Sequence, residues 1–79
     1  MGRVNVNDSK VSGIQSVLIS RKYFTLEQAY NWIYKHNFKH YKVDITDNFY
    51  RFRQYTPLPY KHFFTTKSKT NGIEYIIQF

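Results

Sequence analysis

The sequence has no cysteine, only three glycines and two prolines, and only five acidic residues among its 79. Without cysteine, the chain can form neither a disulfide framework nor a thiolate metal site. No apolar run approaches the roughly 18 residues of a membrane-spanning helix, and the first residues lack the apolar stretch of a signal peptide. We therefore expect a soluble, intracellular protein with no membrane partner.

Aromatic side chains are abundant: seven Phe, eight Tyr and one Trp. A chain of this length forms one domain whose core is small, so its stability depends on dense packing. Each aromatic ring can bury roughly 150–250 Å² and so replace a disulfide or metal as the source of stability.

Basic residues outnumber acidic ones by twelve to five, which gives a formal charge of +7 and a pI near 9.8. Such a charge favours a polyanionic partner, either nucleic acid or an anionic surface. However, 37 of the 79 residues are Phe, Tyr, Met, Ile, Asn or Lys, all with AT-rich codons. Part of the lysine excess can reflect an AT-rich genome rather than function. The lysines are therefore weaker evidence for such a partner than the arginines.

One helix can be predicted from its start, its apolar face and its end. Thr25 and Gln28 have the spacing of a capping box, which places the first helical residue at Leu26. The following apolar residues recur at the spacing of one buried helical face: Leu26, Ala29, Tyr30 and Ile33. Asn37 can adopt the left-handed conformation that ends a helix.

Five strands are predicted around this helix. The first covers residues 14–20 and is apolar enough to be buried on both faces; the others cover residues 41–45, 49–55, 60–67 and 73–79. In the second, Tyr41, Val43 and Ile45 form the apolar face; in the last, Ile73, Tyr75, Ile77 and Phe79 do.

The order β-α-β-β-β-β predicts an α+β fold, with one helix packed on a mostly antiparallel sheet of four to five strands. We expect residues 1–10 to be a flexible N-terminal arm and residues 11–79 to be a single domain. The first and last strands are the most apolar, so we expect them to be neighbours near the middle of the sheet.

Several segments carry a resemblance to a viral domain. They are Ser16-Val17-Leu18-Ile19, Tyr23-Phe24-Thr25 with Ala29 and Trp32, Tyr50-Arg51-Phe52-Arg53-Gln54, and Gly72-Ile73. Across residues 12–79 the chain resembles a small domain of tailed-phage and large DNA virus reading frames, and the leading segment of some phage polypeptides with a prohead-protease-like region. The resemblance implies a viral source and a one-domain unit, and it carries over no established activity. For such a protein we expect a location inside the infected host cell or in the packaged virion. Asn37 departs from the Gly that similar sequences place after His.

The strand at residues 49–55 suggests a nucleic-acid face. Arg51 and Arg53 alternate with Tyr50 and Phe52, so the arginines share the opposite face with Phe49 and Tyr55. Arginine beside aromatic rings on an open sheet can clamp phosphates and stack unpaired bases. Alternatively, the arginines keep an exposed face soluble while Gln54 satisfies a core polar group, or the face is a protein interface.

Two lysine clusters, Lys39 with His40 and Lys42, and Lys67 with Lys69, would extend this surface if the hairpin of residues 41–55 lies beside that of residues 60–79; otherwise they are solvated loops. The complete set of candidate nucleic-acid-binding residues is Arg51, Arg53, Tyr55, Phe49, Lys39, Lys42, Lys67 and Lys69.

Catalytic and metal-binding patterns are not evident. His36 and His40 are four residues apart, but Asn37 should end the helix between them. The carboxylates are scattered rather than paired, and no Gly-rich phosphate loop is present. We predict that the chain is not an enzyme and has no cofactor, metal or small-molecule substrate.

The sequence therefore predicts a small basic viral module that binds nucleic acid with little sequence specificity. The alternative is a protein-interaction module, such as a virion or capsid-assembly component. The net charge and the two prolines beside the strand at residues 60–67, Pro57 and Pro59, favour a monomer.

Overall fold

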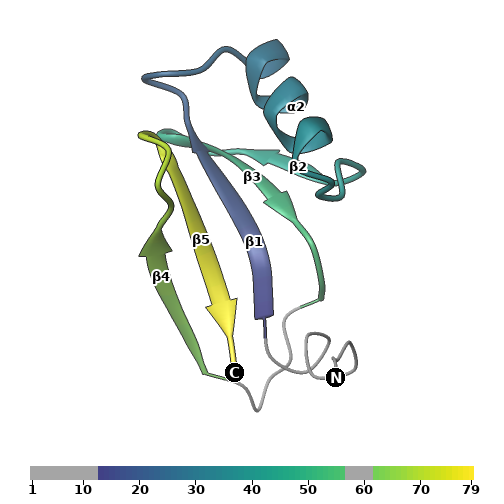
Figure 1. Cartoon of the computed structure of the whole chain (residues 1–79), viewed down its shortest axis with the longest axis vertical. Helices are drawn as coiled ribbons and strands as arrows, with labels where there is room; N and C mark the ends of the chain where they lie inside the picture. Colours follow the sequence, from purple (N-terminus) through teal and green to yellow (C-terminus); the bar gives the residue numbers. More distant parts are fainter. Residues whose placement is uncertain (1–12, 57–61) are drawn as a thin grey trace.

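The computed structural model describes residues 13–56 and 62–79. Within these ranges the chain forms one helix and a five-stranded antiparallel sheet with the strand order β2-β3-β1-β5-β4 (Figure 1). The elements are β1 (Gly13–Ser20), α2 (Leu26–Lys35), β2 (Val43–Ile45), β3 (Phe49–Arg53), β4 (Phe63–Lys67) and β5 (Ile73–Gln78). The predicted α+β fold is confirmed. The predicted N-terminal arm and the two prolines lie outside the described residues.

The helix begins and ends where the sequence predicts. The Thr25 hydroxyl accepts the Gln28 N–H at 3.2 Å, and Oε1 of Gln28 accepts the Thr25 N–H at 2.9 Å, which completes the capping box. Asn37 has φ 61°, the left-handed conformation expected after the last turn. Both helix ends are therefore fixed by local chemistry.

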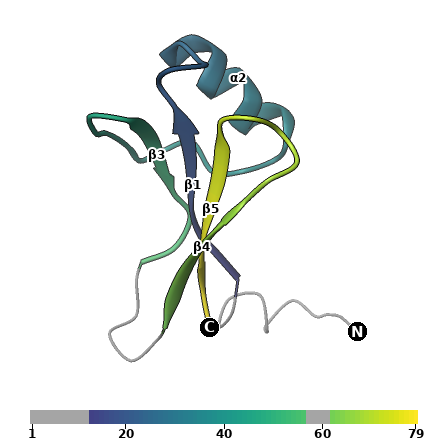
Figure 2. The ribbon, with the colours of Figure 1, turned by 90° about the vertical axis from the view of Figure 1, so that its left-hand side faces the viewer.

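The core lies between α2 and the middle of the sheet. β1 is the central strand and pairs with β3 and with β5, so the first and last strands are neighbours as predicted. The buried apolar side chains are Val17, Ile19, Ala29, Ile33, Tyr50, Phe52 and Ile73. In Figures 1 and 2 the helix lies at one end of the sheet, and the strands extend away from it.

Two predicted apolar faces are covered only in part. In the segment at residues 41–45 Val43 packs on the core, whereas Tyr41 is 79% and Ile45 57% exposed. The reason is that β2 is a three-residue strand at the edge of the described sheet, away from its middle strands. Phe79, at the end of the chain after β5, is 50% exposed. The expectation that these three side chains would be buried was wrong.

The capping box predicts a measurable loss of stability. Thr25→Ala should lower the free energy of unfolding by about 1 kcal/mol, because the helix loses its side-chain acceptor. Asn31→Ala, in the exposed middle of α2, is the control and should be neutral or slightly stabilising because alanine favours helix. Urea denaturation followed by circular dichroism measures both; equal losses would contradict the capping argument.

Candidate nucleic-acid interface

The side chains of β3 alternate as predicted. Tyr50 and Phe52 are buried, while Phe49, Arg51 and Arg53 are half-buried on the other face. Both arginines are held by the protein itself. Arg51 donates to the Ser16 hydroxyl at 3.2 Å and to Oε1 of Gln15 at 3.4 Å.

Arg53 forms a 3.0 Å salt bridge with Asp44 on the neighbouring strand β2. Because the charge of Arg53 is partly offset and Arg51 is fixed within the sheet, the open sheet face offers less available positive charge than the sequence suggests. Replacing both arginines would also remove contacts between strands, so such a variant would test folding as well as binding.

The two lysine clusters lie at opposite edges of the sheet. Lys42 immediately precedes β2 and Lys67 ends β4, and these are the two edge strands. Four strand spacings separate them, about 19 Å. The condition that the two hairpins lie side by side is therefore not met, and Lys67 and Lys69 do not extend the surface of Lys39 and Lys42.

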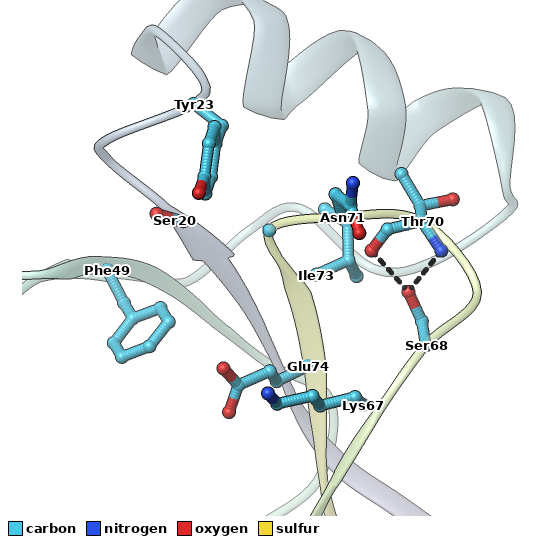
Figure 3. A pocket seen from close by; sticks show the side chains of 10 residues that line it. Ser20, Tyr23, Phe49, Lys67, Ser68, Thr70, Asn71, Ile73 and Glu74 are labelled. Atoms are coloured by element: carbon cyan, nitrogen blue, oxygen red, sulfur yellow. Dashed lines mark hydrogen bonds between the residues drawn. The ribbon is translucent and has the colours of Figure 1, made fainter.

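A pocket of about 340 Å³ lies beside the β4–β5 turn (Figure 3). Phe49 and Lys67 line it, and the Glu74 side chain lies next to that of Lys67, its partner across the β4–β5 pair. The opposite charges of this neighbouring pair offset each other. This pocket therefore has little preference for an anion, although it contains two of the predicted residues.

A smaller hollow beside β3 brings together four of the predicted residues. It measures about 190 Å³, and its lining includes Lys39, Lys42, Arg53 and Tyr55. The Lys39 ammonium lies 4.5 Å from the centroid of the Tyr55 ring, a cation–π contact. None of the described residues that line this hollow is acidic.

A second hollow, of about 500 Å³, adjoins the first and shares Lys39 and Tyr41 with it. It adds Tyr34 and Lys35 from the end of α2, and its described lining also contains no acidic residue. We call the seven basic and tyrosine residues around both hollows the lysine–tyrosine strip: Tyr34, Lys35, Lys39, Tyr41, Lys42, Arg53 and Tyr55.

The sequence prediction missed three members of the strip: Tyr34, Lys35 and Tyr41. A signal was present, since Tyr34-Lys35 and Lys39-His40-Tyr41-Lys42 both place tyrosine beside lysine. The alternating pattern instead predicts that Tyr41 shares the apolar face of a strand with Val43 and Ile45. The helical period alone says little about Tyr34, which is 75% exposed.

Two buried glutamines hold the backbone of the strip in place. The Gln54 amide accepts the Lys39 N–H at 2.8 Å and donates to the Lys39 carbonyl at 2.9 Å. Nε2 of Gln15 donates to the Tyr55 carbonyl at 2.7 Å, beside an irregularity in the β1–β5 register. Gln54 thus satisfies internal polar groups, as the alternative interpretation of this strand supposed.

The described histidines outside the strip lie against aromatic rings or apart from one another. Among residues 13–56 and 62–79, no group of three His or acidic side chains is placed to hold a metal ion. His36 stacks on Trp32 with ring centroids 3.9 Å apart, and His40 lies beside Tyr41 at 5.1 Å. In the same described part of the chain, no helix has the length and hydropathy required to cross a membrane.

Comparisons with known proteins leave the origin of the chain undecided. No family model matches the sequence, and no curated protein or solved structure matches it significantly. The resemblance to a viral domain, and the expectation that the chain is not an enzyme, therefore stay predictions.

The two hydrogen bonds between the Gln54 amide and the backbone of Lys39, which we call the glutamine clamp, predict a local effect on dynamics. Gln54→Leu leaves the N–H and carbonyl of Lys39 without their partner, which should cost about 1–3 kcal/mol and free the loop before β2. Hydrogen exchange followed by NMR should show faster exchange at the Lys39 amide. The Ala29 amide, inside α2, is the internal control for global unfolding; an unchanged ratio of the two exchange rates would contradict the clamp.

Proposed function

We propose that the chain is a small non-enzymatic module that binds nucleic acid through the lysine–tyrosine strip. The observation that carries the proposal is the convergence of three lysines and three tyrosines on two adjoining hollows whose described linings contain no acidic side chain; the fourth cation there, Arg53, is already paired with Asp44. The formal charge of +7 adds a long-range attraction for a polyanion.

The strip has the chemistry for contacts to the nucleic-acid backbone. Lysine ammonium groups neutralise phosphates and release condensed counterions, which gives affinity that depends steeply on salt. Tyrosine rings can stack on any base, because every base has an aromatic face. Because neither kind of contact distinguishes one base from another, little sequence specificity is expected.

The proposal includes the viral origin that the sequence resemblance implies. A monomeric viral protein of this kind would act on nucleic acid inside the infected cell or be packaged with it. Phosphate contacts by Lys39 and Lys42 would serve either setting, because they do not depend on the base sequence.

The β4 edge of the sheet supports a second candidate function, protein interaction. β4 is an edge strand, and Phe63, Phe64 and Phe79 are 44–50% exposed there. The rings of Phe64 and Phe79 lie 5.5 Å apart and form one aromatic surface. An extended segment of a virion or capsid protein could add to this edge as a further strand.

A matched pair of double variants tests the first function. Affinity for a DNA oligonucleotide should fall with salt by a slope of roughly −0.7 to −0.9 per phosphate contacted. Lys39→Gln with Lys42→Gln should reduce the steepness of that slope by about one and a half units, whereas Lys67→Gln with Lys69→Gln, at the opposite edge, should leave it nearly unchanged. Fluorescence anisotropy titrations at several salt concentrations measure both slopes.

Two results would overturn this assignment. One is the absence of DNA binding at low salt. The other is equal slopes for the two double variants, because diffuse charge alone would then account for binding. In either case the β4 edge becomes the better candidate, and a protein partner should be sought there.

A further inference from the structure

Two tyrosines of the strip contribute little to the fold. Tyr34 is 75% and Tyr41 79% exposed, and neither packs against the hydrophobic core. Each aromatic ring can bury roughly 150–250 Å², area that a domain this small needs for its stability. Two rings left outside the core, both among lysines and both lining a hollow, therefore indicate a role in binding rather than in stability.

The linings of the two hollows suit two planar groups that are neighbours in one ligand. The smaller hollow, of about 190 Å³, is open to the surface and is lined by Tyr41 and Tyr55, on whose rings a planar group could stack. The larger one lies directly beside it, and Lys39 and Tyr41 belong to both linings. A ligand with two neighbouring rings joined by a charged backbone matches this arrangement.

We infer that the lysine–tyrosine strip holds two successive unpaired bases of a single-stranded nucleic acid, one in each hollow, with Tyr41 between them and Lys39 and Lys42 on the phosphates. This inference rests on the proposed function and specifies its ligand. Lys39 is exposed, and its ammonium makes a cation–π contact with Tyr55, so it can turn to a phosphate while the Tyr55 ring is used for stacking.

A DNA duplex would make fewer contacts with the lysine–tyrosine strip than a single strand. In double-stranded DNA the bases are stacked on one another, and proteins reach only their edges through the grooves. The tyrosine rings would then have no base face to contact, and only the lysines would bind. An unpaired strand exposes its base faces, which aromatic side chains can stack upon.

The test compares a 12-nucleotide oligothymidylate with a 12-base-pair duplex at the same salt concentration. The wild-type chain should bind the single strand at least tenfold more tightly. Tyr34→Leu combined with Tyr41→Leu should remove most of that preference and leave both the salt slope and the duplex affinity unchanged. Tyr34→Phe with Tyr41→Phe keeps the rings and should retain the preference.

Tyr23→Leu is the matched control, because Tyr23 is 62% exposed but lines the pocket beside the β4–β5 turn. It should retain single-strand affinity, and circular dichroism should show that all variants are folded. If the leucine variant does not fold, the affinities of the wild-type chain for the single strand and the duplex still test the inference.

Equal wild-type affinity for the two nucleic acids, with the salt dependence retained, would overturn the inference and keep the proposed function. A folded leucine variant that keeps the wild-type preference for the single strand would also overturn the inference and keep the proposed function. The absence of salt-dependent binding to either nucleic acid would overturn both.

Discussion

The structure depends on one constraint: a single short helix must cover a five-stranded sheet. Ten residues at 1.5 Å each give a helix of about 15 Å, which is shorter than the roughly 19 Å between the two edge strands. At the end of the sheet where it lies, α2 therefore covers the three middle strands β1, β3 and β5, which supply Val17, Phe52 and Ile73 to the core. The edges keep their aromatic side chains exposed, so both candidate surfaces lie there.

Buried polar groups connect this core to the proposed site. Gln15 and Gln54 are 1% and 8% exposed, and their amides hold the backbones of Tyr55 and Lys39. A buried amide is retained at low cost only when its hydrogen bonds are made. These glutamines fix the backbone beneath flexible lysine side chains, which can then adapt to a ligand without loosening the fold.

Local features of the structure could be predicted, whereas the long-range arrangement could not. The capping box at Thr25 and the alternation around Phe52 are read from neighbouring residues, and both are confirmed. Alternation also places Tyr41 on the same strand face as Val43 and Ile45, but alternation does not determine whether another layer covers that face. The order of the strands decides that the two lysine clusters lie apart, and the register between β2 and β3 decides that Arg53 meets Asp44; neither is contained in local pattern.

The geometry of the strip places the proposed nucleic-acid contact at the β2 edge of the sheet rather than at the β4 edge. Backbone amide shifts of the isotope-labelled chain, recorded by NMR during titration with a short oligothymidylate, locate the contact directly. Changes concentrated at residues 34–42 and 53–56 are expected. Changes concentrated at residues 63–69, with the strip unaffected, would contradict the account.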